Sequence, residues 1–159
     1  MWTCFGSFTV RASDVDAVVE AGGGGRAGGL TRRAADGAAL AKERGIEVRI
    51  ASFGNYDVIQ AYCDLALGVG AMTREDISTP SVVGSRDGCS VEGGKNKQLQ
   101  KICEEMYGID AWRERADAVV LFDDDERNVQ AAIAGGFRAV HTPDGFDARA
   151  ARIIFPNDF

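Results

Sequence analysis

Residue types that mark several common protein classes are scarce in this chain of 159 residues. It has a single histidine, and its four cysteines (Cys4, Cys63, Cys89 and Cys103) are widely spaced, with no Cys-x-x-Cys pair. A structural zinc site needs several such ligands at close spacing. We therefore expect no zinc cluster, and we interpret the cysteines as reduced thiols of a cytoplasmic protein.

An excess of basic charge and long apolar runs are also absent. The chain carries 18 Lys and Arg against 24 Asp and Glu, a formal net charge of −6. A net negative charge disfavours binding to nucleic acids and to anionic membranes. No apolar run reaches the roughly 20 residues that cross a bilayer. The first residues also lack the basic-then-apolar order of a signal peptide. We expect no nucleic-acid partner and no membrane partner.

The chain instead shows alternating strand and helix patterns. A length of 159 residues suits one domain, residues 1–159, with a buried core. We predict a long irregular loop at residues 68–94, where glycines and a proline lie among polar residues. The alternation predicts an α/β fold with a mostly parallel sheet. The expected strands are residues 5–10, 47–52, 119–122 and 137–140, and the expected helices are residues 32–44, 56–67, 95–107 and 129–134.

The most informative stretch is the transition from apolar to acidic residues within 119–128. Val119 to Phe122 are apolar, and Asp123 to Glu126 are acidic. This pattern predicts a short strand, buried on both faces, that delivers carboxylates at its carboxyl end. Open parallel sheets bind their ligands at that edge. Neighbouring carboxylates repel one another unless a cation lies among them, and oxygen ligands suit Mg²⁺. The alternative is a solvated acidic loop.

Other polar side chains stand at predicted strand and helix ends. Ser52 closes the strand at residues 47–52, and Lys95 and Lys97 open a helix. Asp14 and Asp16 are spaced i, i+2, which in an extended segment places both carboxylates on one face. The alternative for this pair is an Asx-type turn that leads into a strand.

In this order, the residues resemble the four motifs of the haloacid dehalogenase superfamily of phosphohydrolases. The spacing leaves no room for a cap domain, and the chain is most similar to the small magnesium-dependent phosphatases. The resemblance implies a three-layer αβα sandwich around a central, mostly parallel, Rossmann-like sheet without a cap. The motifs stand as Asp14-Val15-Asp16-Ala17-Val18, Ile50-Ala51-Ser52, Gly94-Lys95-Asn96-Lys97 and Asp123-Asp124-Asp125-Glu126-Arg127-Asn128.

The resemblance implies a Mg²⁺-dependent phosphomonoesterase that acts on a phosphorylated small molecule or a phosphoprotein. Asp14 would be the nucleophile that forms an aspartyl-phosphate. Asp16 would protonate the leaving group and then activate water. Ser52 would donate to a phosphoryl oxygen. Lys95 would offset the negative charge, with Lys97 as the alternative.

The same resemblance implies a metal site. Mg²⁺ would be held by Asp14, the backbone carbonyl of Asp16, and Asp124, with Asp123 nearby. Asn128 would orient these carboxylates.

Two other functions stay open. A receiver-type signalling domain also gathers acids, a hydroxyl and a lysine at strand ends, but its lysine follows the serine on the last strand. A catalytically silent domain of the haloacid dehalogenase type is the second alternative. It is kept because Arg11 and Ser13 interrupt the apolar strand that should precede Asp14. Such a domain would bind metal and phosphate without turnover.

Overall fold

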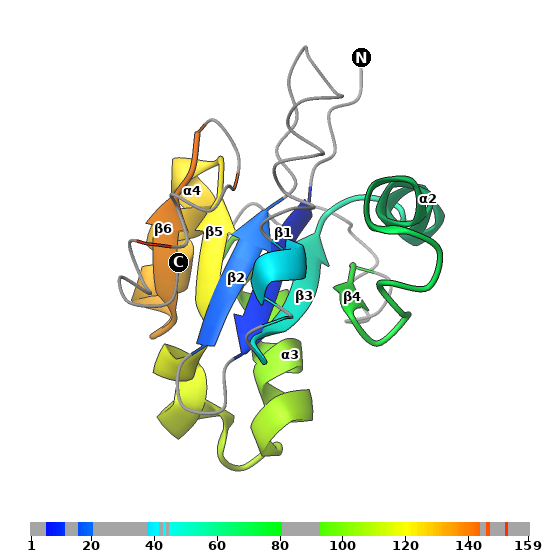
Figure 1. The fold of residues 1–159 in the computed structure, drawn as a ribbon. Helices are drawn as coiled ribbons and strands as arrows, with labels where there is room; N and C mark the ends of the chain where they lie inside the picture. Colours follow the sequence, from blue (N-terminus) through cyan, green and yellow to red (C-terminus); the bar gives the residue numbers. More distant parts are fainter. Residues whose placement is uncertain are drawn as a thin grey trace.

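A computed structural model describes residues 6–11, 16–20, 38–41, 43, 45–80, 93–143, 146 and 152, with residues 6–11, 16–20 and 66 described by their backbone alone. Helices and strands alternate over most of this part of the chain (Figure 1). The predicted α/β class is therefore confirmed. The strands are β1 (Gly6–Arg11), β2 (Asp16–Glu20), β3 (Glu47–Ser52), β4 (Ile77–Ser78), β5 (Val120–Asp123) and β6 (Arg138–His141), and the helices are α2 (Tyr56–Leu67), α3 (Asn96–Tyr107), the 3-10 helix η1 (Trp112–Ala118) and α4 (Glu126–Ala134).

The strands form one mixed sheet in the order β4-β3-β1-β5-β6, and β2 pairs with β1 outside this order. β3 and β4 are parallel and are connected through α2, and β5 and β6 are parallel and are connected through α4. Each set is a β-α-β unit, the connection that parallel neighbours require. Residues 38–41 are also helical and lie in front of the sheet in Figure 1, while α3 lies behind it.

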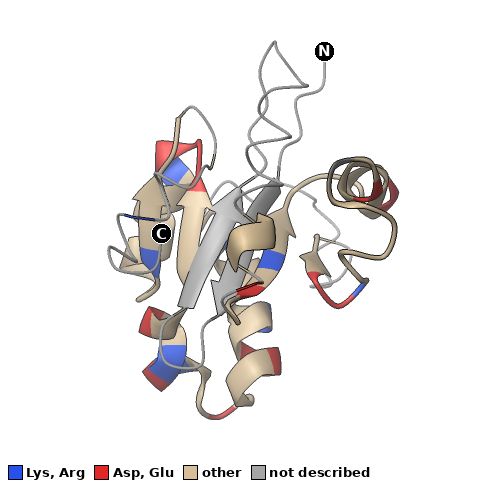
Figure 2. Ribbon diagram, in the orientation of Figure 1, with Lys and Arg blue, Asp and Glu red and all other residues tan. Residues whose placement is uncertain are grey.

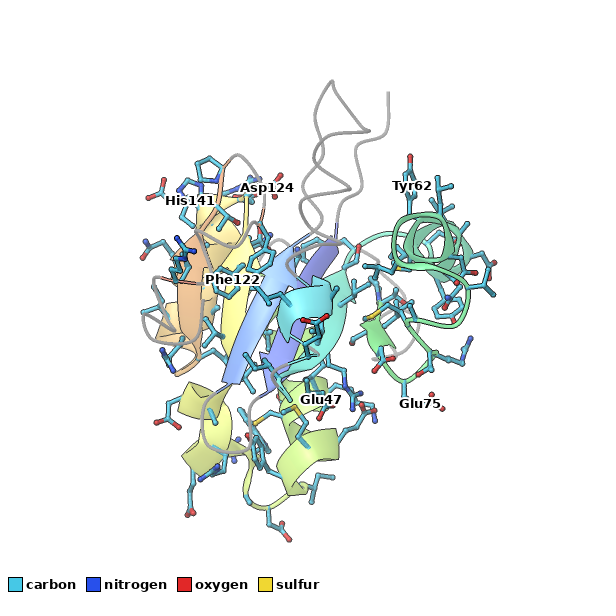
Figure 3. The ribbon with its side chains drawn as sticks, viewed as in Figure 1. Glu47, Tyr62, Glu75, Phe122, Asp124 and His141 are labelled. Atoms are coloured by element: carbon cyan, nitrogen blue, oxygen red, sulfur yellow. The ribbon has the colours of Figure 1, made fainter. Side chains whose placement is uncertain are left out.

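The prediction of a mostly parallel sheet is wrong at the centre, because β1 runs antiparallel to both β3 and β5. Its register pairs Gly6 with Ser52 and Arg11 with Glu47. The carboxyl end of β1 therefore lies where β3 begins, at the end of the sheet opposite to Ser52. Figure 3 shows these two ends, with Glu47 at one and Asp124 and His141 at the other.

A second strand, β2, lies next to β1. β2 begins at Asp16 and pairs antiparallel with β1, with Asp16 opposite Arg11. Only residues 12–15 connect the two strands, and so short a connection can join only antiparallel neighbours. Asp16 therefore starts a strand rather than following the end of one. The alternative interpretation of the Asp pair was an Asx-type turn that leads into a strand. That strand is present as β2, whereas residues 12–15, where the turn would lie, are outside the described part.

Two other elements differ from the sequence analysis. β4 lies inside the predicted loop 68–94 and pairs with Ile50 and Ala51 through only two residues, Ile77 and Ser78. So short a strand has no period to detect. α4 begins at Glu126, three residues earlier than predicted, because the side chain of Asp125 accepts a hydrogen bond from the backbone N–H of Arg127 and caps the helix.

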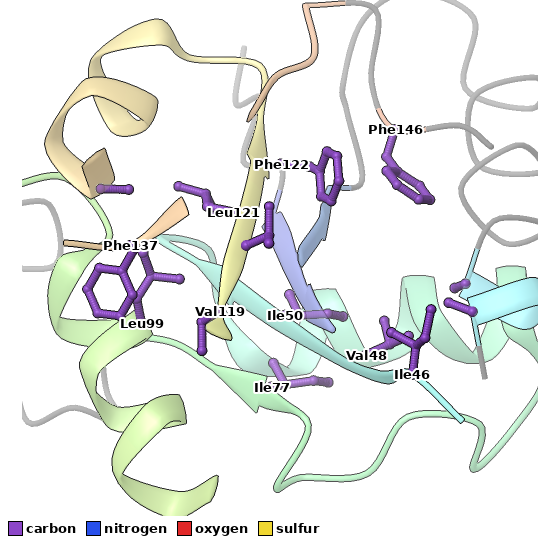
Figure 4. Packing of buried hydrophobic residues seen from close by; sticks show 14 of the residues in the cluster. Ile46, Val48, Ile50, Ile77, Leu99, Val119, Leu121, Phe122, Phe137 and Phe146 are labelled. Carbon is purple, nitrogen blue, oxygen red and sulfur yellow. The ribbon is translucent and has the colours of Figure 1, made fainter. Parts of the chain in front are cut away.

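The core fixes the position of β5. Its apolar residues are fully buried, as the run from Val119 to Phe122 predicted (Figure 4). The Phe122 ring meets Phe146 edge to face, with 5.1 Å between centroids. Because close-packed interiors leave little freedom, the residue that ends β5 is held as firmly as the strand itself. Leu99, Ile50 and Ile77 come to the same cluster from α3, β3 and β4.

No helix in the described part of the chain combines the length and the apolar character that crossing a membrane requires.

Candidate functional site

The carboxyl ends of β3 and β5 carry two of the predicted site residues, and the start of α3 carries a third. Ser52 and Asp123 are 0% exposed, and Lys95, the N-cap residue of α3, is 2% exposed. Lys95 Nζ lies 2.7 Å from Asp123 Oδ2. The same Nζ lies 5.7 Å from the ring centroid of Phe53, the residue after Ser52. The ends of both strands therefore meet at Lys95.

The Asp123 carboxylate is bonded through both of its oxygens. Oδ1 accepts hydrogen bonds from the backbone N–H of Asp125 at 2.8 Å and from Asn128 Nδ2 at 3.1 Å. Oδ2 accepts from Asn128 Nδ2 at 3.2 Å and pairs with Lys95. A buried charge is tolerated only when it is paired and hydrogen-bonded. Asp123 is therefore a fixed anchor for the lysine ammonium.

Ser52 is fixed by the turn that follows it. The backbone N–H of Gly54 donates to Ser52 Oγ at 3.0 Å. Asn55 then begins α2, since its Oδ1 accepts from the backbone N–H of Asp57 at 2.9 Å. A hydroxyl that accepts one bond still has its own O–H to donate. The turn thus holds Ser52 as a potential donor at the sheet edge.

The turn from β5 into α4 is acidic, and Figure 2 shows it in red. The Arg127 side chain, hydrogen-bonded to Asp125, holds the pKa of that carboxyl below its usual value, and the backbone N–H of Arg127 adds to this effect. The same pairing raises the pKa of Arg127. His141 Nε2 lies 3.1 Å from the backbone oxygen of Asp124. The His141 ring is thus satisfied by the backbone, and it lies beside Asp124 in Figure 3.

The predicted metal ligands do not come together in the described structure. Asp14 lies outside the described residues, and Asp16 starts β2 at the far end of the sheet. Both oxygens of Asp123 already bond to Lys95, Asn128 and the backbone N–H of Asp125. Asp124 is the remaining predicted ligand; it is partly exposed and has no ion-pair partner among the described residues. Within the described ranges, no group of three or more His, Cys, Asp or Glu could hold a metal ion. One open carboxylate does not fit a Mg²⁺ site, which takes several oxygen ligands.

The structure separates the two candidate lysines. Lys95 is buried against Asp123, whereas the side chain of Lys97 is exposed. The geometry therefore favours Lys95 as the lysine of the site.

Asn96, next to Lys95, is a residue of this site for which the sequence predicts no role. Its Nδ2 donates to the backbone oxygen of Ala131 in α4 at 2.8 Å. Two glycine pairs in the sequence could have indicated this contact: Gly93-Gly94 before Lys95 and Gly135-Gly136 at the end of α4. Glycines are common where two backbones approach closely.

In chemical terms, one edge of the sheet holds an ammonium, a hydroxyl and two acidic side chains. Ammonium and hydroxyl groups are the donors that recognise anions such as phosphate. The scan against protein-family models found no match for this chain, and the searches of curated proteins and of solved structures found none either.

Proposed function

We propose that this chain is a phosphomonoesterase domain of the haloacid dehalogenase type. The observation that supports the proposal is the buried ion pair between Lys95 and Asp123 at the edge where Ser52 ends β3. Burying a lysine costs desolvation free energy. Binding of a dianionic phosphate would explain why a buried ammonium stands at this position. The order of these residues along the chain also follows the resemblance.

Each residue of this edge has a role in the proposal. Ser52 donates its O–H to a phosphoryl oxygen, and the Lys95 ammonium offsets the negative charge of that group. Asp123 keeps the ammonium in place, and Asn128 orients Asp123 through its amide. Phosphate recognition therefore depends on residues that the structure describes.

The reacting carboxylates of the proposal come from the resemblance alone. Asp14 attacks the phosphorus atom and forms an aspartyl-phosphate. Asp16 protonates the leaving alkoxide and then takes a proton from the water that breaks the intermediate. This chemistry requires that both acids lie beside Ser52, which the direction of β1 opposes for Asp16.

Three finer features also belong to the proposal. The fold is a three-layer αβα sandwich without a cap, the location is the cytoplasm, and the substrate is a phosphorylated small molecule or a phosphoprotein. Mg²⁺ dependence is proposed on the resemblance, with Asp124 as the ligand that the described residues offer.

A second candidate function is a domain of the same type that binds phosphate without hydrolysing it. The antiparallel direction of β1 favours this function, because it places Asp16 at the end of the sheet away from Ser52. The phosphate-binding residues Ser52 and Lys95 do not depend on that direction.

Hydrolysis of para-nitrophenyl phosphate, with and without Mg²⁺, tests the two functions. The proteins to compare are the wild type, Asp14→Asn, and the control Asp57→Asn on the exposed side of α2. Mg²⁺-dependent turnover that Asp14→Asn abolishes and Asp57→Asn retains would support the phosphatase. Turnover that survives in Asp14→Asn would show that the nucleophile is another residue.

Titration with inorganic phosphate completes the test. Binding of phosphate without turnover would favour the non-hydrolysing domain. A wild-type protein that neither hydrolyses the ester nor binds phosphate would contradict both functions.

A further inference from the structure

The start of α3, which carries Lys95, has no cap of its own. The N-cap residue Lys95 makes no side-chain cap hydrogen bond, and the first turn contains no acidic residue. The backbone N–H of Asn96 donates to the backbone oxygen of Gly93 at 3.1 Å. The two preceding residues, Gly93 and Gly94, have φ of +83° and +52°. Glycines are the residues with the greatest backbone freedom. Contacts with other elements can therefore contribute to the position of Lys95, in addition to the backbone bond between Asn96 and Gly93.

Helix α4 provides these contacts. Asn96 Nδ2 donates to the backbone oxygen of Ala131 at 2.8 Å. A Cβ added to Gly94 would lie 3.0 Å from Asn128 Oδ1, and a Cβ added to Gly135 would lie 2.7 Å from Asn96 Nδ2. At 2.7 Å the Asn96 amide would have to shift, and at 3.0 Å Asn128 would have to move by a few tenths of an ångström. The two helices reach this distance because both positions are glycine.

The same interface fixes the partner of Lys95. Asn128, which lies against Gly94, donates its amide to both oxygens of Asp123. α4 therefore sets both members of the buried ion pair, Asp123 through Asn128 and Lys95 through the neighbouring Asn96.

The side-chain amide of Asn96 is satisfied at its nitrogen and unsatisfied at its oxygen. Its Oδ1 is buried without a hydrogen-bond partner, whereas its Nδ2 bonds to Ala131. A buried acceptor without a partner is unfavourable. The N–H bond to α4 is the interaction that explains an amide at this position.

We propose that Asn96 is a positioning residue, which holds the Lys95 ammonium against Asp123 and, on the function proposed above, against a phosphoryl group. Gly94 and Gly135 provide the space that this bond needs. The part of the inference that concerns phosphate rests on the proposed function, whereas the part that concerns Lys95 and Asp123 does not.

The first test measures how fast the amine of Lys95 is acetylated, with peptide mass spectrometry as the readout and the exposed Lys97 as the internal reference. In the wild type, Lys95 reacts slowly because it is buried. In Asn96→Ala and in Gly135→Ala, we expect its rate relative to Lys97 to rise about tenfold, because the start of α3 opens locally. Ile102→Val weakens the buried side of the same helix without touching Asn96 and should leave the ratio unchanged. A ratio that rises equally in Ile102→Val would overturn the proposal.

The double variant Asn96→Ala with Gly135→Ala tests the route of the effect. The methyl group added at position 135 meets Asn96 Nδ2. If Asn96 carries the effect, the double variant reacts no faster than Asn96→Ala alone, since interacting residues are not additive. Independent, multiplicative effects would show that Gly135 acts on Lys95 by another path, and the proposal would be wrong.

The second test is the dissociation constant of inorganic phosphate. We expect it to rise about tenfold in Asn96→Ala, which corresponds to the loss of one well-placed charged contact. If the wild type binds no phosphate while the acetylation ratio changes as expected, the proposed function fails and the positioning of Lys95 stands. If the wild type binds phosphate and Asn96→Ala alters neither readout, the positioning role fails and the proposed function stands.

Discussion

The buried pair of Lys95 and Asp123 shows how single residues of this site could be predicted. The sequence indicates Asp123 as a site residue because it directly follows four apolar residues. It indicates Ser52 because this residue closes an alternating segment. A strand end is visible in the sequence, and so is the polar residue that occupies it. Asn96 was not found, because its partner is the backbone oxygen of Ala131, and no side chain in the sequence marks that contact.

Replacing Lys95 by methionine should destabilise the protein strongly. The fully buried Asp123 would lose its ion pair with Lys95, while the bonds from the Asp125 N–H and the Asn128 amide would remain. Breaking a buried pair in this way costs about 3–5 kcal/mol, whereas the exposed Lys97→Met should change the free energy of unfolding by less than about 0.5 kcal/mol. Urea unfolding of both variants measures the difference. Asp123→Asn in the Lys95→Met background should recover part of the loss, and costs that simply add would show that the two charges are independent.

The pairing of Asp125 with Arg127 predicts a change in pKa. Arg127 lowers the pKa of Asp125 below the usual value of 3.8. Because the carboxyl is more acidic in the folded state, the pair stabilises the fold above this pH, and the contribution is lost as the pH falls through the folded pKa. Arg127→Gln should return the pKa of Asp125 towards 3.8, with little effect on stability because solvent screens the pair. NMR titration of the Asp125 carboxyl carbon tests this, and a pKa that stays as low in Arg127→Gln would assign the shift to the backbone at the start of α4.

At the scale of elements, helices were predicted better than short strands. α2 runs from Tyr56 to Leu67 and α3 from Asn96 to Tyr107, as expected to within a residue, because Gly68 and Gly108 end them visibly. The sequence did not indicate β4, since two residues contain no pattern; it pairs with β3 where the buried Ile77 lies opposite the buried Ile50. Local patterns therefore define an element only when it is long enough to repeat.

The junction of α3 and α4 predicts different costs for two neighbouring glycines. Gly93→Ala and Gly94→Ala both place a side chain at positive φ, but a Cβ at position 93 has no atom within 4 Å, whereas one at 94 lies 3.2 Å from the Cα of Asn128. Backbone strain should cost about 1–2 kcal/mol at both positions, and the collision should add about 1–3 kcal/mol at Gly94 alone. Urea unfolding of the two variants gives the comparison. Equal losses would mean that α4 moves away without cost, so that the junction does not hold Lys95 tightly.

At the scale of the whole molecule, the fold class could be predicted and the direction of β1 could not. Alternating strands and helices specify an α/β sheet, and the β5-α4-β6 unit follows from its helical connection. The segment around β1 reads as a strand in either direction. Its orientation depends on pairing with β3 and β5, which are distant in the sequence, and on β2, which turns the chain back at Asp16. The half of the candidate site that Ser52, Lys95 and Asp123 form was therefore predictable, whereas the position of Asp16 was not.

The direction of β1 can be measured with a pair of engineered cysteines, and the result decides between the two proposed functions. In Arg11→Cys with Glu47→Cys, the two residues are register partners, so their Cα atoms should be about 4.5–5.5 Å apart and able to form a disulfide. In the control, Arg11→Cys with Ser52→Cys, five residues of β3 separate the sites, roughly 17 Å along an extended strand, and no bridge should form. Mild oxidation followed by non-reducing peptide mapping identifies each bridge apart from the native cysteines. A bridge only in the first pair would confirm the antiparallel β1 and favour phosphate binding without hydrolysis, because Asp16 would then lie far from Ser52. A bridge only in the control pair would show that β1 runs towards Ser52 and would support the proposed phosphatase, because the acids that follow β1 would then lie near Ser52.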